Sequence, residues 1–242
     1  MPIIETVGLH WRDFRNQFLD LLFPPHCIGC RQAGAWLCAD CLAQIPRVEP
    51  PFCARCGNAV ATDGLCARCR IAPLQIECIR SVVYFEGVLR EAVHHLKYHG
   101  RTALAESLGG LMAAYWVQHP MPADVIVPVP LHTARLRERG YNQASLLAHE
   151  MACRVGLTLN EQTLVRRRAT ASQVKLDARQ RKENVRDAFR CSDDTLAGKQ
   201  VLLIDDVCTT GATLAACAVA LHEGGARSVQ ALTLARPRRA SN

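Results

Sequence analysis

Short apolar runs and segments with helical spacing alternate along most of the chain. The runs "ECIRSVVYF", "DVIVPV" and "QVLLI" hold several β-branched or aromatic residues, which pack well on a pleated surface and are typical of strands. Between these runs, apolar residues recur every three or four positions, as in amphipathic helices. The pattern predicts strands at 78–85, 124–129, 200–204 and 227–235, helices at 88–98, 102–118, 141–154 and 212–223, and a long basic connection at 164–187.

This order of elements predicts the fold class. Strands that alternate with helices, some of them apolar throughout, are typical of a parallel sheet that helices cover on both faces. We therefore expect an α/β domain at residues 77–242.

The N-terminal third of the chain shows a different pattern of residues. Residues 9–22 carry apolar side chains at helical spacing, which predicts an amphipathic helix within a segment 1–23 that packs on protein or, alternatively, on a membrane surface. Cysteines recur along residues 26–70, and this segment shows neither helical nor strand periodicity. We expect a small domain at 24–72 before the α/β domain.

The composition is that of an ordinary globular protein, with 49% hydrophobic and 21% charged residues among 242. The first residues lack the basic and apolar regions of a secretory signal, and no apolar run approaches the roughly 18 to 20 residues of a membrane span. These features predict a cytoplasmic protein without a membrane span.

Eight of the thirteen cysteines form four Cys-x-x-Cys pairs. In a reducing compartment such pairs are typical of metal sites, because each places two thiolates on one cation and two pairs complete a tetrahedral site. We expect two structural zinc ions, with an iron–sulfur centre or redox dithiols as alternatives. Sequential pairing closes the shorter loops, although interleaved pairing stays open; the sequential sets are Cys27, Cys30, Cys38 and Cys41, and Cys53, Cys56, Cys66 and Cys69.

The stretch "VLLIDDVCTTGATL" at 201–214 carries the strongest functional signal. Ligands of a parallel sheet bind beyond the carboxyl ends of its strands, and we expect the strand to end where Asp205 and Asp206 begin. The loop 208–213 offers backbone N–H groups, hydroxyls and a glycine at a helix start, which suit a phosphate. Because carboxylates do not bind phosphate, the two acids suit sugar hydroxyls or Mg²⁺ on the same ligand.

Positive charge is concentrated in one segment. Residues 135–190 hold 13 Lys and Arg against six Asp and Glu, an excess of seven that equals the formal charge of the whole chain. Such an excess favours phosphates, pyrophosphate or nucleic acid as ligands, although a solvated face is the alternative.

The 201–214 stretch resembles the phosphoribosyl pyrophosphate (PRPP) signature of type I phosphoribosyltransferases. Further motifs that precede this signature make the resemblance more specific. In chain order they are the paired cysteines, "HHLKYHGR", "VPVPLHTARLRERGYNQA" and "TASQVKLDARQRKENVRDAF". Together they resemble the ComF family, which is associated with DNA uptake in naturally transformable bacteria. The resemblance implies a double zinc ribbon followed by a type I phosphoribosyltransferase fold.

The resemblance also implies roles for individual residues. Asp205 and Asp206 would hold the ribose hydroxyls as the catalytic pair, and PRPP would come with Mg²⁺. The 5′-phosphate would lie against Thr209, Thr210, Gly211, Ala212 and Thr213. The loop with Pro130, Leu131 and His132 would occupy the place of the pyrophosphate loop, and the candidate pyrophosphate contacts are Arg137, Arg139 and Lys97. Asn142 and Gln143 would begin the next helix. A mobile hood over PRPP would contain Arg166, Arg167, Arg168, Gln173, Lys175, Arg179 and Arg181.

Three nearby histidines allow a second metal hypothesis. Glu91, His95 and His99 are spaced by four and could share one helix face, with His94 beside them. The helix ends at about His99 and no known motif is present, so we expect these histidines to be helix-surface residues.

Three functional hypotheses follow. The first is a phosphoribosyltransferase that stabilises a ribosyl oxocarbenium-like transition state while arginines and Mg²⁺ neutralise pyrophosphate, with an acceptor that the sequence does not identify. The second is a module that binds single-stranded DNA through the ribbon and the basic segment. The third is a PRPP-sensing regulator. Proteins of the competence machinery are possible partners in each case.

Overall fold

The computed structural model describes residues 24–168 and 187–238. The chain divides into two compact units, 1–45 and 46–242, and each unit is described by itself. The predicted helix at 9–22 and four predicted hood residues, Gln173, Lys175, Arg179 and Arg181, lie outside the described residues. Within the described ranges, no helix is both long and apolar enough to cross a membrane.

The first unit contains the short helix α2 (Ala39–Ala43) and a turn in which His26 bridges Ala33. Its buried side chains include Cys27, Leu37 and Ile45. The described part of this unit, 24–45, has only a small apolar core and needs a further source of stability, which is typical of small metal-binding folds.

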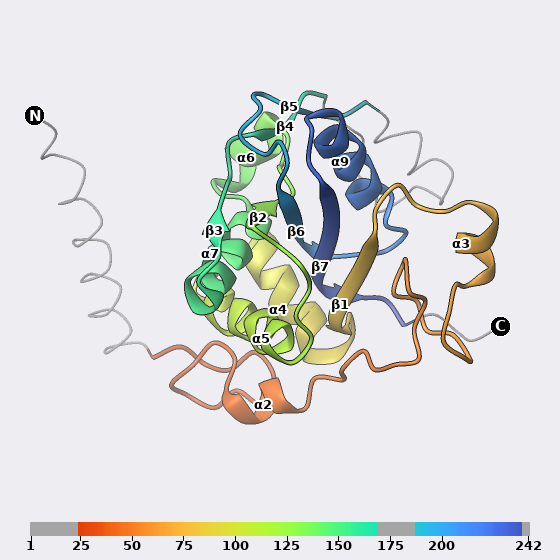
Figure 1. The fold of residues 1–242 in the computed structure, drawn as a ribbon. Coiled ribbons are helices and arrows are strands. Elements are labelled where there is room, and N and C mark those ends of the chain that lie inside the picture. The colour runs from red at the N-terminus through yellow and green to blue at the C-terminus, as the bar shows by residue number, and fades with distance from the viewer. Residues whose placement is uncertain (1–23, 169–186, 239–242) are drawn as a thin grey trace, which may run out of the picture. The chain divides into compact units, whose positions relative to one another are not determined.

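The second unit is built on a five-stranded parallel sheet in the order β1-β7-β6-β2-β3 (Figure 1). The predicted α/β fold with a parallel sheet is confirmed. Its strands are β1 (Cys78–Tyr84), β7 (Ser228–Arg236), β6 (Gln200–Val207), β2 (Val125–Pro128) and β3 (Thr158–Leu159).

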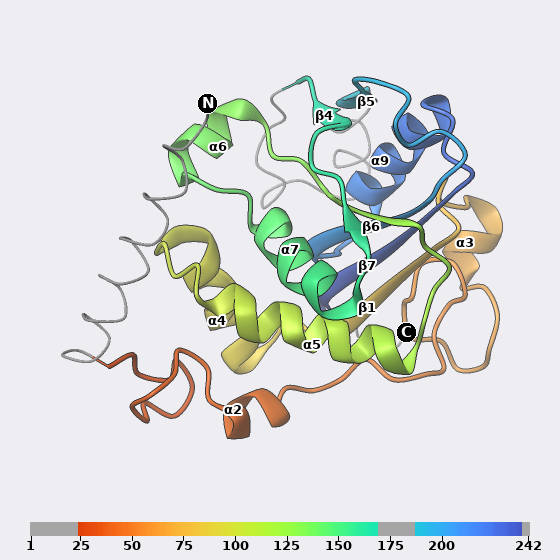
Figure 2. The ribbon, with the colours of Figure 1, turned by 60° about the vertical axis from the view of Figure 1, so that its left-hand side comes forward.

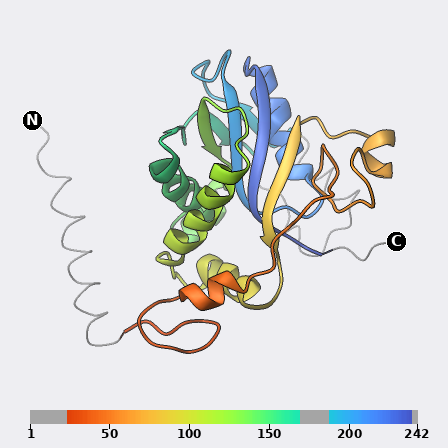
Figure 3. The ribbon, with the colours of Figure 1, turned by 60° about the horizontal axis from the view of Figure 1, so that its bottom comes forward.

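Helices cover both faces of this sheet (Figures 2 and 3). The helices α5 (Leu104–Gln118) and α7 (Gln143–Val155) lie on one face, with α4 (Gly87–Tyr98) beside α5, and α9 (Ala212–Glu223) lies on the other. Because side chains alternate along a strand, Val201 and Leu203 belong to the core under α9, whereas Leu202 and Ile204 point to the opposite face.

Within the expected α/β domain, four of the described elements were not predicted from the sequence. The helix α6 (Thr133–Arg139) and the strand β3 are short, and β4 (Leu164–Arg166) pairs antiparallel with β5 (Phe189–Cys191). The expectation of a connection from 164 to 187 is therefore wrong at its start. These strands form because Leu164 and Phe189 are buried in the core. They were missed because a three-residue strand is too short to show a period.

The second cysteine set belongs to the same compact unit as the sheet. The division after Ile45 lies well before the expected boundary at 72–77. Residues 46–48 run antiparallel to the edge strand β1, since the N–H of Val48 donates to the Val82 oxygen at 3.0 Å. This segment covers a sheet edge that would otherwise be unpaired.

Three arginines fix the second cysteine set to the ends of β1 and β7. The oxygen of Arg55 accepts from the N–H of Ile79 at 2.7 Å, and Nη1 of Arg80 donates to the Ala54 oxygen at 3.0 Å. Arg236, which is buried, donates from Nη1 to the Cys56 oxygen at 3.1 Å. A buried guanidinium requires hydrogen-bond acceptors, and the ribbon backbone supplies one to Arg236 of the sheet.

Gly57 lies where this attachment is tightest. Its φ is +68°, and an added Cβ would lie 2.5 Å from the Ile79 oxygen. Gly156, the C-cap of α7, has a similar φ of +71°, but a Cβ there would meet nothing within 4 Å.

We therefore expect Gly57→Ala to lower the thermal unfolding midpoint more than Gly156→Ala does. Both variants carry the backbone cost of a left-handed residue, about 1–2 kcal/mol, and only Gly57→Ala adds the steric clash. Thermal unfolding of the zinc-loaded protein, followed by circular dichroism, measures the difference. Equal midpoints for the two variants would contradict the attachment.

Candidate functional site

Asp205 and Asp206 lie within β6, near its carboxyl end. The strand continues to Val207, so the expectation that it ends at 204 is wrong; pairing of Asp205 with Thr233 and of Val207 with Ala235 in β7 extends it. Adjacent residues of a strand point to opposite faces. Asp205 therefore lies on the α9 face and Asp206 on the α4 face.

Asp206 forms an ion pair with Lys97 of α4. The Asp206 side chain is only 5% exposed and that of Lys97 21%, so the pair is largely shielded from water. Although burial acts in the opposite direction, the charge of Lys97 lowers the pKa of Asp206, and Asp206 in turn raises the pKa of Lys97. In this structure Lys97 is thus the counter-charge of Asp206, a pairing that the sequence did not predict.

Asp205 has a different environment. It is half-buried, and burial together with the neighbouring charge of Asp206 raises the pKa of the Asp205 carboxyl to about 8. Arg166 of β4 lies close enough that Asp205 affects its pKa, although burial has the larger effect and lowers it. The Arg166 guanidinium is held over the Phe189 ring at 5.3 Å from the centroid. Arg166, one of the three predicted hood residues that the structure describes, thus lies near Asp205.

The loop after β6 leads directly into α9. Gly211 is the N-cap of this helix, with φ +77°, a conformation that favours glycine. Thr210 is buried, and its hydroxyl oxygen accepts from the N–H of Ala212 at 3.3 Å. Thr209 and Thr213 are half-buried. A loop of this kind at the N-terminus of a helix can bind an anion with its backbone N–H groups.

The other predicted contacts lie on α6 and the adjoining loops. Arg139 contacts the side chain of Gln143, and its guanidinium lies 5.4 Å from the centroid of the Tyr98 ring, whereas Arg137 is exposed. His132 caps α6 by accepting at Nδ1 from the N–H of Ala134 at 3.2 Å. These contacts give Arg139 a defined position next to the end of α4.

Asn142 connects α7 to the sheet. Its Oδ1 accepts from the N–H of Ala144 at 3.1 Å, and its Nδ2 donates to the Val129 oxygen at 3.0 Å. The predicted start of a helix at Asn142 and Gln143 is confirmed, with Asn142 as N-cap. Side-chain capping of this kind fixes the loop that follows β2.

The three histidines of α4 lie near one another at the end of the helix. The rings of His95 and His99 are 4.7 Å apart at their centroids, and those of His94 and His99 are 5.1 Å apart. His94 and His99 are exposed and His95 is half-buried. Within the described ranges, groups of at least three metal-binding side chains occur only at the two cysteine sets.

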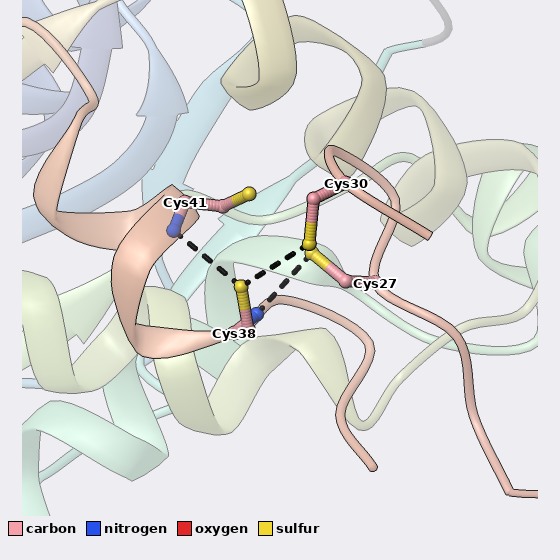
Figure 4. Close-up of side chains that lie close together, drawn as sticks. All are labelled: Cys27, Cys30, Cys38 and Cys41. Carbon is pink, nitrogen blue, oxygen red and sulfur yellow. Dashed lines mark hydrogen bonds between the residues drawn. The ribbon is translucent and has the colours of Figure 1, made fainter. Parts of the chain in front are cut away.

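The first cysteine set gathers four thiols around α2 (Figure 4). Its sulfur atoms all lie within 4.8 Å of one another, and the N–H of Cys38 donates to the Cys27 sulfur at 3.4 Å. Burial would raise the pKa of Cys27, but backbone N–H groups, that of Cys38 first, lower it to about 6. This backbone stabilises a thiolate, which is the form that binds a metal.

The second set repeats this arrangement around α3 (Ala67–Ile71). Its sulfur atoms also lie within 4.8 Å of one another, and the N–H of Cys66 donates to the Cys53 sulfur at 3.3 Å. Against the effect of burial, backbone N–H groups lower the pKa of Cys53 to about 6. The sequential grouping is therefore the one that the structure adopts.

Both sets fit zinc. Four thiolates satisfy a tetrahedral structural site and leave no position for a substrate, so the metal would hold each ribbon together and take no part in a reaction. The tetrads account for the eight paired cysteines as the sequence predicted.

We expect the purified protein to contain about two zinc ions per chain, because each tetrad has the donors of one structural site. Elemental analysis of protein purified without chelators measures this ratio. Less than one zinc per chain, or the visible absorption of an iron–sulfur centre, would contradict it.

We expect Lys97→Met to lower the free energy of unfolding by about 3–5 kcal/mol, because the substitution leaves the Asp206 carboxylate buried without its counter-charge. Arg154→Met is the matched control: it removes a helical cation from the more exposed pair with Glu150, where the loss should be about 0.5 kcal/mol or less. Urea denaturation measures both, and equal losses would contradict the role given to Lys97.

Two known domain families match this chain. The double zinc ribbon domain matches residues 18–70, and the phosphoribosyl transferase domain matches residues 137–241. Among solved structures, the glutamine PRPP amidotransferase from B. subtilis has a TM-score of 0.38 and 22% identity, over 53% of this chain and 25% of that one.

Curated relatives match over almost their whole length. The DNA utilization protein YhgH of Salmonella typhi is 37% identical over 227 residues, which cover 89% of this chain and 99% of that protein. Competence protein F of Haemophilus influenzae is 28% identical over 223 residues, covering 87% and 96% respectively. The chain therefore belongs to the ComF family, in which a double zinc ribbon precedes a phosphoribosyltransferase domain.

Proposed function

We propose that this protein binds PRPP with Mg²⁺ at the carboxyl end of β6 and acts there as a phosphoribosyltransferase-like protein. The observation that carries the proposal is the pair Asp205 and Asp206, placed directly before a threonine- and glycine-containing loop at the N-terminus of α9. Carboxylates suit the hydroxyls of a sugar, and the loop suits its phosphate. A ligand that carries both groups on one ribose satisfies the two features together.

Each carboxylate would accept hydrogen bonds from ribose hydroxyls. Asp205 is the more accessible of the two, since it is half-buried. Asp206 is engaged with Lys97, but an ionised carboxylate has about four acceptor positions, so the ion pair leaves it capacity for a hydroxyl. The 5′-phosphate would lie against the backbone N–H groups of residues 209–213.

The cations of the site would receive the pyrophosphate. Arg166, held over Phe189, lies near Asp205, and Arg139 lies against Tyr98 at the end of α4. Positive charge so placed stabilises the negative charge that develops as pyrophosphate leaves C1 of the ribose. Bound Mg²⁺ would supply further neutralisation of that charge. The ribosyl group would then pass to an acceptor through an oxocarbenium-like transition state.

The names of the relatives suggest the biological setting. Proteins named for DNA utilization and for competence cover nearly the whole chain, so we place this activity in DNA uptake or in the nucleotide metabolism linked to it. Competence-machinery proteins are the expected partners. Binding of single-stranded DNA by the basic segment, and PRPP sensing without turnover, stay as alternatives to transfer.

We expect Asp205→Asn to weaken PRPP binding by roughly 10- to 100-fold at pH 9 in the presence of Mg²⁺, because the Asp205 carboxylate is formed at that pH and a charge-assisted hydrogen bond is worth roughly 1.5–3 kcal/mol. Asparagine keeps the size of the side chain, so the fold should be retained. Isothermal titration calorimetry measures the affinity. Asp124→Asn is the matched control, because Asp124 accepts from the N–H of Gln200 at the opposite end of β6.

The same titration should depend on pH. Burial raises the pKa of Asp205 to about 8, so the carboxylate that accepts the ribose hydroxyls is formed as the pH rises. The affinity of the wild-type protein for PRPP should therefore increase between pH 7 and pH 9, and the affinity of Asp205→Asn should increase less. Wild-type protein that does not bind PRPP, but binds single-stranded oligonucleotides at low salt, would support the nucleic-acid alternative instead.

A further inference from the structure

Gly211, the glycine of the predicted phosphate loop, lies directly against two apolar side chains that are distant from it in the sequence. A Cβ added at Gly211 would lie 2.9 Å from Cδ1 of Leu74 and 2.9 Å from Cδ1 of Ile79. Such distances are shorter than real carbon–carbon contacts, so the loop backbone rests on these two residues. A change in the position of either side chain would therefore change the support of the loop.

Leu74 belongs to two hydrophobic clusters at once. It packs against the core under α9, which includes Cys208 and Ala212 at the two ends of the loop. It also packs against the buried cysteines of the second tetrad, Cys53, Cys56 and Cys69. The Leu74 side chain thus packs both against the cysteines of a candidate metal site and against the core beneath the predicted phosphate loop.

Arg55 holds this contact in place through the backbone. It lies between Cys53 and Cys56, inside the turn that supplies two of the four thiols. Its Nη1 donates to the Leu74 oxygen at 2.8 Å and to the Ile76 oxygen at 3.2 Å, and its own oxygen accepts from the N–H of Ile79 at 2.7 Å. Both residues that support Gly211 are therefore connected by hydrogen bonds to one cysteine turn.

We propose that the second zinc ribbon is a positioning element for the phosphate-binding loop, acting through Leu74. Closure of the tetrad fixes the turn at Cys53 and Cys56, the turn fixes Arg55, and Arg55 fixes Leu74 and Ile79 beneath Gly211. Leu74 is a positioning residue and touches no ligand. The proposal rests on the proposed function where PRPP affinity is concerned, and it also predicts an effect on the unliganded loop.

Leu74→Ala tests the apolar contact. We expect it to weaken PRPP binding by roughly 2- to 30-fold, the range of coupling through contiguous packing, and to speed hydrogen exchange of the amides at 208–213 without ligand. Leu74→Met should restore both, because it refills a similar volume. Ile71→Ala is the matched control: Ile71 lies three residues away and is 86% exposed, so neither quantity should change.

A second pair of variants tests the metal. Cys69→Ser removes one ligand from the second tetrad, and Cys41→Ser removes one from the first, which belongs to the other compact unit. Each should lower the zinc content. Cys69→Ser should weaken PRPP binding and speed exchange at 208–213 more than Cys41→Ser does.

The outcomes separate the two claims. Wild-type protein that fails to bind PRPP would overturn the proposed function, while the exchange rates at 208–213 would still test the positioning role. Unchanged exchange and unchanged affinity in folded Leu74→Ala would overturn the positioning role and leave the proposed function standing. Equal effects of Cys69→Ser and Cys41→Ser would overturn the assignment to the second ribbon.

Discussion

Two adjacent carboxylates on a central strand cannot share one environment, because successive side chains point to opposite faces of a sheet. Asp206 points to the α4 face, where the cation of Lys97 compensates its charge. Asp205 points to the α9 face, where it remains half-buried and its pKa is raised to about 8. The rest of the candidate site is arranged around this division: the helix that carries Lys97 lies on one side, and the helix that begins at Gly211 lies on the other.

The second cysteine set depends on two other strands of the same sheet, β1 and β7. Arg55, Arg80 and Arg236 exchange hydrogen bonds between the ribbon and the ends of β1 and β7. Since β7 is the neighbour of β6 in the sheet, the ribbon and the acidic pair are fixed to adjacent strands. This gives a zinc ribbon a reason to accompany a phosphoribosyltransferase domain: the sheet supplies the core that a small ribbon lacks.

Much of this architecture was predictable because long elements carry a clear period. The helix α4, predicted at 88–98, the parallel sheet and the sequential grouping of cysteines could all be predicted from spacing. Short elements such as α6 and β4 could not, because they are held by tertiary contacts of residues such as Leu164. The pairing of Lys97 with Asp206 and the support of Gly211 by Leu74 were also beyond the sequence, because each joins residues more than 100 positions apart.

A crystal structure of the protein soaked with Mg²⁺ and PRPP tests the central claim most directly. The account predicts the 5′-phosphate on the backbone N–H groups of residues 209–213, the ribose hydroxyls within hydrogen-bond distance of Asp205, and the pyrophosphate on the side of Arg166 and Arg139. Density for PRPP at another surface, or a ribose turned away from the acidic pair, would contradict it.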